Sequence, residues 1–234
     1  MIELTPWQEA RRKNNGVAGL QKMHNFQPGG GGMGYWPGNR DPHPWASNYV
    51  LHFITEAERA GFSIPLDLKN KLVKFQSKVA ANWRESSDPF YATTRQRSLD
   101  QAYRLCGLAL AGKAEIGAMN RLRGKAADLS VPAIYNLAAA YAIVGQKSAA
   151  DELISGQGVV VKAYRELGYT FGSDIRDMAM ILESQLAAGD QSAAGKQAFR
   201  LAERIGKRSW LSTQEAAFAF VAIGKMSEAD DQEL

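Results

Sequence analysis

The sequence has 234 residues, a length typical of one large domain or two small ones. With 45% hydrophobic and 22% charged residues, it has the composition of a folded globular chain. The net charge of +4 is small and dispersed, so it excludes no globular class but argues against a nucleic-acid partner. No run of about 18 apolar residues occurs, so we expect no direct membrane insertion of this segment. The single cysteine, Cys106, excludes an intramolecular disulfide and a multi-cysteine zinc site.

The first third of the chain predicts helices around one unusual loop. Residues 6–25 have a helical pattern that we expect to be interrupted near Asn14–Gly16. The loop 27–44 contains four consecutive glycines and several prolines, a density that no helix survives. A helix is predicted over Trp45–Ala60, where aromatic and aliphatic residues repeat at intervals of three and four. Gly61 ends it, because glycine adopts the left-handed backbone conformation without steric cost.

The rest of the chain alternates between two kinds of predicted helix, after one further helix that starts at Pro65 and has a single apolar stripe. A helix that is apolar nearly all round must be buried on every side, whereas a striped helix lies at the surface. Strict alternation therefore predicts inner and outer layers built from successive helical hairpins. The nearly all-apolar helices are expected at 98–111, 130–144, 173–188 and 212–223. The striped ones are expected at 114–127, 147–154 and 191–205, and residues 159–161 could form a short strand or an irregular crossing.

A serine stands at or near the N-terminus of each predicted inner helix and of the helix predicted over Trp45–Ala60. Serine is a favourable N-cap, because its hydroxyl accepts a hydrogen bond from a backbone amide of the first turn. Ser212 and Glu215 also have the spacing of a capping box. The serines recur at intervals of 32 to 51 residues, which is typical of a two-helix repeat with variable loops. The predicted N-caps are Ser47, Ser98, Ser130, Ser173 and Ser212.

Three sequence motifs, in order along the chain, carry a resemblance to a known family. The first comprises Gly-Gly-Gly-Gly-Met-Gly-Tyr-Trp-Pro-Gly at 29–38, the stretch from Asp41 to Phe53 and Ala-Gly-Phe-Ser-Ile-Pro at 60–65. The second is Gly-Ser-Asp-Ile-Arg-Asp at 172–177, and the third is Trp-Leu-Ser-Thr-Gln-Glu-Ala-Ala-Phe-Ala at 210–219. Together they resemble the thioester domain of bacterial alpha-2-macroglobulins, which is similar to that of complement.

This resemblance implies an all-α fold, the α/α toroid of inner and outer helices, here expected as a single domain over 1–234 with an incomplete ring. It also implies a segment of a broad-spectrum endopeptidase inhibitor that traps proteases, and not an enzyme. The expected partners are target proteases, bound through the full-length protein, and neighbouring domains of the same chain. The expected location is the periplasm or cell envelope, although this segment begins without the pattern of a signal peptide. No cofactor or metal is expected.

The thioester itself is the feature that the sequence lacks. In the family, a cysteine and a glutamine of a Gly-Cys-x-Glu-Gln motif form the thioester, which acylates a nucleophile of the protease. That motif is absent, and Cys106 lies in Arg-Leu-Cys-Gly-Leu, so this chain cannot form the bond. We interpret Cys106 as a buried apolar residue. By resemblance, four aromatic residues lie near the thioester position, where they would either exclude water or anchor the glycine-rich loop. These residues are Tyr35, Trp36, Trp45 and Tyr49.

Two other readings remain open at this point. An α/α-toroid enzyme acting on a carbohydrate or an isoprenoid would need paired acids in a central cleft, for which Asp100 and Asp177 are the best candidates. Both are also explained by the favourable position of an anion at a helix N-terminus, and Arg176 beside Asp177 favours a structural pair. The third reading is a non-catalytic helical interaction scaffold. The histidines, His24, His43 and His52, do not have the spacing of metal ligands.

Overall fold

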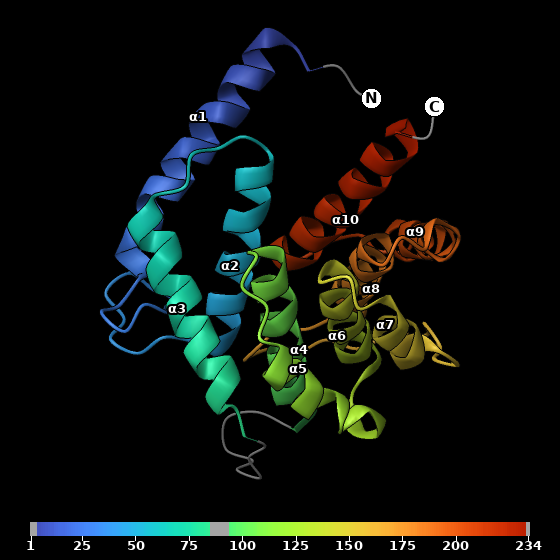
Figure 1. Ribbon diagram of the computed structural model, residues 1–234. Coiled ribbons are helices and arrows are strands. Elements are labelled where there is room, and N and C mark those ends of the chain that lie inside the picture. The colour runs from blue at the N-terminus through green and yellow to red at the C-terminus, as the bar shows by residue number, and fades with distance from the viewer. Residues whose placement is uncertain (1–3, 85–93, 233–234) are drawn as a thin grey trace. The chain divides into compact units, whose positions relative to one another are not determined.

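The computed structural model describes residues 4–84 and 94–232, and the regular structure of those residues is helical (Figure 1). The contacts group the chain into two compact units. Unit 1 comprises Met1–Trp83 and Gly107–Glu115, and unit 2 comprises Arg84–Cys106 and Ile116–Leu234. The helix α4, Thr94–Leu110, therefore contributes to both units. None of the helices in the described ranges is long and apolar enough to cross a membrane.

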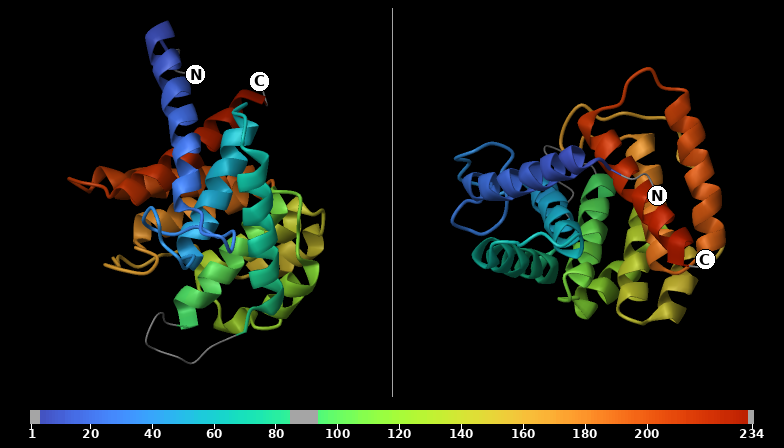
Figure 2. Two further views of the ribbon diagram at one scale, coloured as in Figure 1. Left: turned by 90° about the vertical axis from the view of Figure 1, so that its left-hand side faces the viewer. Right: turned by 90° about the horizontal axis from the view of Figure 1, so that it is seen from above.

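Unit 1 is built on α1 (Pro6–Lys22), α2 (Pro44–Arg59) and α3 (Leu66–Asn82), with a short 3-10 helix, η1, at Met23–Phe26. α2 and α3 pack against each other, and the first turns of α1 extend beyond their ends (Figure 2). The interruption expected in α1 near Gly16 does not occur, since one glycine costs a helix only about 1 kcal/mol. Gly16 has a packing role, because a Cβ there would lie 2.4 Å from the ring of Phe62.

Unit 2 contains two successive helical hairpins, α6 with α7 and α8 with α9, followed by α10. α8 contacts both α6 and α10 (Figure 1). Ahead of the hairpins lie α5 and a short 3-10 helix, η2. The bounds are α5 Ile116–Arg123, η2 Ala126–Asp128, α6 Val131–Ile143, α7 Lys147–Ile154, α8 Asp174–Ala187, α9 Gln191–Gly206 and α10 Thr213–Gln232.

The predicted inner and outer layers are present in the two hairpins. α6 is buried almost throughout, including Leu137, which has no exposed surface, and most of α8 is buried as well. α7 and α9 bury one face only, through residues such as Leu153 and Leu201. The expectation for α10 needs correction, because Phe220 is 75% exposed although its sequence is nearly all apolar. α10 buries Phe218 and its neighbours against unit 2 and leaves a second apolar face uncovered in this chain.

The repeat is clearest at the ends of the helices. α2, α4, α6 and α8 are each followed by a glycine with positive φ, between 71° and 84°. At each, the amide of the glycine bonds the carbonyl three residues back, and the next amide bonds the carbonyl five residues back. This pair of bonds is the Schellman motif, which satisfies the carbonyls left over at a helix end. The four glycines are Gly61, Gly112, Gly145 and Gly189.

The connection between α7 and α8, residues 155–173, contains no helix. The strand considered for 159–161 does not form, and an isolated antiparallel bridge joins Arg165 to Ser173. Two of its residues, Tyr169 and Phe171, have φ of 52° and 48°, a conformation that is costly for residues with a Cβ. This connection therefore has to be stabilised by contacts outside its own backbone.

Candidate functional site

The glycine-rich loop of unit 1 packs with its backbone directly on α3. The Gln27 side-chain amide donates to the carbonyls of Gly31 and Leu68, at 3.0 and 3.1 Å. A Cβ on Gly31, whose φ is 88°, would lie 2.7 Å from the carbonyl oxygen of Lys71. Only glycine allows this approach, because a side chain would both clash and require an unfavourable φ. The loop is therefore fixed against the helix.

Ser47 ties the other end of this loop to α2 and is not the N-cap that we predicted. Its hydroxyl accepts from the amide of Met33 at 2.8 Å and donates to the carbonyl of His43 at 2.9 Å. α2 begins earlier, at Pro44, because the fixed φ of proline suits the first position of a helix. Ser98 is likewise corrected, since α4 begins at Thr94 and Ser98 is buried within it.

The four aromatic residues singled out in the sequence lie in different environments. Trp45 is buried, whereas Trp36 is 73% exposed. Tyr35 is half-buried, and its ring contacts that of His43 at 4.4 Å between centroids. Tyr49 is also half-buried, and burial raises the pKa of its phenol. Three of the four therefore have the partial or full burial of anchoring residues, and Trp36 presents its ring to solvent.

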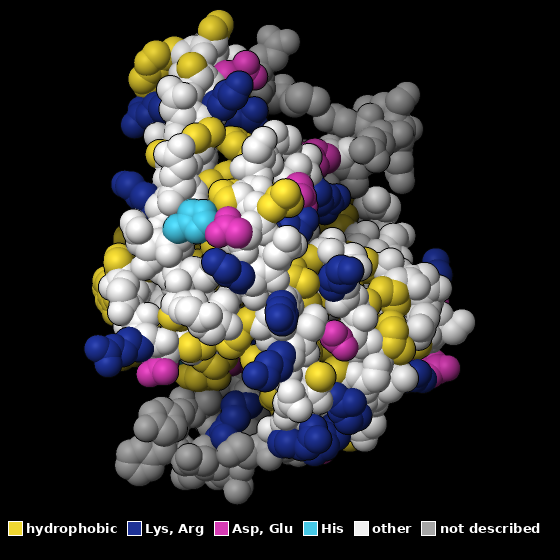
Figure 3. All heavy atoms as spheres, turned by 60° about the vertical axis from the view of Figure 1, so that its left-hand side comes forward, with side chains coloured by type: hydrophobic (Ala, Val, Ile, Leu, Met, Phe, Trp, Pro, Cys, Tyr) yellow, Lys and Arg dark blue, Asp and Glu magenta, His cyan; other side chains and the backbone are white. Residues whose placement is uncertain are grey.

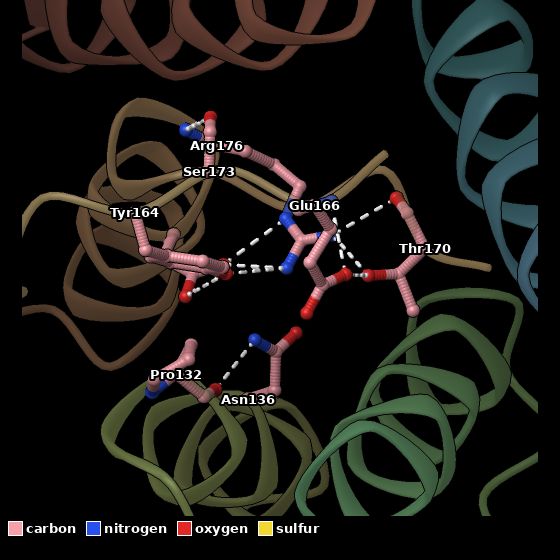
Figure 4. A network of polar contacts seen from close by, with 9 residues as sticks. Pro132, Asn136, Tyr164, Glu166, Thr170, Ser173 and Arg176 are labelled. Carbon is pink, nitrogen blue, oxygen red and sulfur yellow. Dashed lines mark hydrogen bonds and ion pairs between the residues drawn. The ribbon is translucent and has the colours of Figure 1, made fainter. Parts of the chain in front are cut away.

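In unit 2 a polar network surrounds Arg176 at the start of α8 (Figure 4). Its guanidinium donates twice to one oxygen of Asp177, at 3.0 and 2.7 Å, and to the carbonyl and hydroxyl of Thr170, at 3.1 and 3.0 Å. Tyr164 donates to the other oxygen of Asp177 at 2.8 Å. Burial acts against the charged guanidinium, but Asp177 holds the pKa of Arg176 above its ordinary value. The buried charges thus satisfy each other.

The connecting segment folds closely around this network. Glu166 accepts from the hydroxyl of Thr170 and, at 3.1 Å, from the amide of Gly172. A Cβ on Gly172 would lie 2.8–2.9 Å from polar atoms of Arg176, Tyr164 and Glu166. Burial raises the pKa of Tyr164 far above its ordinary value, which keeps the phenol protonated as a donor.

The second acid considered in the sequence, Asp100, is also engaged in a structural contact. It accepts a hydrogen bond from Tyr169, and burial raises the pKa of that phenol well above its ordinary value. Neighbouring Arg104 is buried, and its guanidinium donates a hydrogen bond to the side-chain oxygen of Gln101. Asp174, fully buried at the start of α8, accepts hydrogen bonds from two arginines, Arg204 and Arg208. Asp100 and Asp174 are thus each bonded to side chains of this same chain, as Asp177 is.

The remaining predicted caps differ among themselves. Ser173 is the N-cap of α8, and its hydroxyl accepts from the amide of Arg176 at 3.2 Å. Ser212 and Glu215 exchange the two bonds of a capping box, at 2.7 and 3.2 Å. Burial opposes ionisation of Glu215, but bonds from Ser212 and Ser173 hold its pKa below the ordinary value. Ser130 occupies the N-cap position of α6 without a capping bond.

The histidines and the cysteine were the remaining candidates for metal ligands. His52 lies 3.8 Å from Glu56 within α2, and His24 lies 3.9 Å from Asp67. In the part of the chain that the structure describes, no group of three or more His, Cys, Asp or Glu side chains could hold a metal ion. Cys106 is buried within α4.

The comparisons with known proteins agree with the motifs. No protein-family model matches this chain. Its sequence is 27% identical over 231 residues to the alpha-2-macroglobulin of Escherichia coli strain K12, and 25% identical over 240 aligned positions to that of Xylella fastidiosa. These matches cover 92% and 97% of this chain. The chain spans only 13% and 14% of the length of those two relatives.

The fold comparison gives the same result. The structure is similar to that of native Escherichia coli alpha-2-macroglobulin, solved from domain MG7 to the C-terminus, with a TM-score of 0.82 and 22% identity. The match covers 96% of this chain and 36% of that one. The predicted fold class, all-α and of the α/α-toroid type, is thereby confirmed.

Proposed function

We propose that this chain, which is similar in sequence and fold to bacterial alpha-2-macroglobulins, is a segment of the thioester domain of a broad-spectrum endopeptidase inhibitor. One observation carries the proposal: the sequence similarity to a bacterial alpha-2-macroglobulin runs over 92% of the chain. The three motifs, which occur in the order that the resemblance implies, support it. The hydrogen bonds of Asp177 and Asp100 to side chains of this chain support a non-enzymatic role, because they explain both buried carboxylates without a substrate.

The proposed role of this segment is to support the trapping reaction, not to carry the reactive bond. In a thioester-dependent trap, cleavage elsewhere exposes an activated acyl group, and an amine of the protease attacks it. The bond survives until then because water is excluded from it. This chain has no Gly-Cys-x-Glu-Gln motif, and Cys106 is buried within a helix. The thioester would therefore come from another segment of the parent polypeptide.

The glycine-rich loop and its aromatic residues supply the proposed shield near that position. Tyr35, Trp45 and Tyr49 are held by burial, and Trp36 offers an exposed ring that another domain can cover. In this proposal the partners are target proteases, bound by the full-length protein, and neighbouring domains of the same chain. The proposed location is the periplasm or cell envelope, and fractionation of cells with a periplasmic marker enzyme tests it.

A trapping assay on the full-length parent protein tests the function. The parent is mixed with trypsin in equal amounts, and cleavage of azocasein is compared with cleavage of a small chromogenic peptide. A trap excludes large substrates from the protease but leaves its active site open, so we expect azocasein cleavage to fall and peptide cleavage to persist. The 234-residue chain alone is the control and should change neither rate. Unchanged azocasein cleavage with the full-length protein would overturn the proposal.

Methylamine separates the two ways in which such a trap could work. Incorporation of labelled methylamine into the full-length protein, with loss of covalent protease adducts on a denaturing gel, indicates a thioester. Trapping without incorporation indicates steric enclosure alone, and rules out the covalent mechanism.

A further inference from the structure

A groove of about 670 Å³ lies in unit 1 along α3, between this helix and the glycine-rich loop. Gly29, Gly30 and Gly31 line it from the loop, and residues of α3 from Lys71 onward, together with Trp83 just after its end, line it from the helix. The glycine side is held in place by the close contact of Gly31 with the carbonyl of Lys71. The shape of the groove is therefore fixed by close packing of the loop backbone on α3.

Two parallel stripes of side chains line α3 in this groove. One stripe is basic and consists of Lys71, Lys74 and Lys78, which follow one another at intervals of three and four residues. The other is apolar and consists of Phe75, Val79 and Trp83, at intervals of four. Figure 3 shows basic side chains spread over the face that it presents, with hydrophobic side chains exposed between them.

Among the described residues, most of the positive charge of the basic stripe is not neutralised by a nearby carboxylate. Lys71 lies 3.6 Å from Asp67, an exposed pair of the kind that contributes little. Within the described ranges, Lys74 and Lys78 have no carboxylate partner. Phe75 and Val79 beside them are only partly buried. The groove is therefore complementary to a ligand that brings negative charge to the lysine stripe and apolar groups to the other stripe.

We propose that this groove binds an extended peptide segment of another protein in which acidic and apolar residues alternate. In an extended chain, alternate side chains point to the same side and repeat about every 7 Å. The three lysines lie within eight consecutive residues of helix, a rise of roughly 10 Å, which matches two such carboxylates about 7 Å apart but is too long for one phosphate. The opposite side of the same peptide places apolar side chains toward Phe75, Val79 and Trp83.

Binding of a defined probe tests this assignment. A fluorescein-labelled hexapeptide of alternating Asp and Leu is titrated with the full 234-residue chain, and fluorescence anisotropy gives the dissociation constant. The double variant Lys74→Glu/Lys78→Glu should bind at least tenfold more weakly, a change equal to about 1.4 kcal/mol. The matched control, Lys147→Glu/Lys207→Glu, makes the same change of net charge at exposed positions of unit 2 and should bind like the unaltered chain.

Two further probes distinguish this peptide from other anions. A hexapeptide of alternating Asp and Gly should bind at least tenfold more weakly than the Asp-Leu peptide, because it leaves the apolar stripe uncovered. Vesicles of phosphatidylglycerol should not bind in a way that depends on Lys74 and Lys78. Equal binding of both peptides, equal losses in the two double variants, or vesicle binding that only the Lys74/Lys78 variant loses would each overturn the proposal.

Discussion

Gly172 leaves room for three polar groups that meet at the start of α8. A methyl group there would lie 2.8 Å from Arg176 Nη2 and the Tyr164 hydroxyl, and 2.9 Å from a Glu166 oxygen. All three atoms take part in hydrogen bonds, so none can move without cost. The absence of a side chain at Gly172 thus allows the buried Arg176–Asp177 pair to keep its hydrogen bonds.

We therefore expect Gly172→Ala to lower the free energy of unfolding by about 1–3 kcal/mol, the range for overpacking. Urea denaturation measures it. The control is Gly158→Ala, where no atom lies within 4 Å of the added methyl and φ is ordinary. Both changes reduce the freedom of the unfolded chain equally, so their difference reports the native clash. Equal stability of the two variants would show that the network shifts freely.

The sequence allowed part of this network to be foreseen. Arg176 and Asp177 are adjacent, which favoured a structural pair, and the pair is present. The roles of Tyr164, Thr170 and Glu166 could not be foreseen, because they depend on a connecting segment with positive φ at residues that seldom adopt it. Gly172 itself was a usable signal, since a glycine beside a helix start often marks close approach of side chains.

At the scale of elements, burial of α6 is the clearest consequence of its sequence. Leu137 is fully buried in the middle of this helix. Its replacement by Ala should reduce the free energy of unfolding by about 2–5 kcal/mol, because a cavity is left in a packed interior. Leu167→Ala is the control, since that side chain is 89% exposed and should change stability by no more than about 0.5 kcal/mol. A cost for Leu137→Ala in the range of the control would contradict the inner-layer assignment.

The capping box of α10 depends on pH. Bonds from Ser212 and Ser173 hold the pKa of Glu215 below its ordinary value, against the effect of burial. A carboxyl whose pKa is lower in the folded state stabilises the fold above its unfolded pKa of about 4.3, and this contribution is lost as pH falls further. We expect Glu215→Gln to cost about 1 kcal/mol at pH 7, where a charge-assisted bond is lost. The difference should shrink below about pH 4, and chemical denaturation at both pH values measures it.

Helix positions were largely predictable, and the serine caps proposed for α2 and α4 were the exceptions. The apolar pattern placed α7 and most of α6, α8 and α9 within a residue or two. We expected Ser47 and Ser98 to cap α2 and α4. α2 begins earlier, at Pro44, after His43 in an extended conformation, and α4 begins earlier, at Thr94. The glycines after α2, α4, α6 and α8 are the more regular signal of the repeat, because each ends its helix by the same pair of hydrogen bonds.

At the scale of the molecule, α4 belongs to both units and carries the single thiol. Cys106 is the last residue of α4 in unit 2, and Gly107 begins the part of α4 in unit 1. Burial of this cysteine was predicted because free cysteine is among the most buried residue types. The division between the units was not predicted, because the helical pattern runs through it without interruption.

The thiol is therefore a probe of unfolding. Because Cys106 is buried, we expect its reaction with Ellman's reagent in buffer to be far slower than in denaturing urea, where the whole chain exposes it. Across a urea series, the rate should follow the loss of helical circular dichroism. A native rate equal to that of the unfolded chain would show that α4 opens locally at the junction of the two units.

The hydrogen bonds around Arg176 and those of Asp174 close loops of very different length. Its hydrogen-bond partners lie one, six and twelve residues away in sequence, and Tyr164 meets Asp177 over thirteen. Asp174, by contrast, meets Arg204 and Arg208 over 30 and 34 residues. Closing a short loop costs less chain entropy than closing a long one. The hydrogen bonds around Arg176 therefore cost less chain entropy to form than those that bring Arg204 and Arg208 to Asp174.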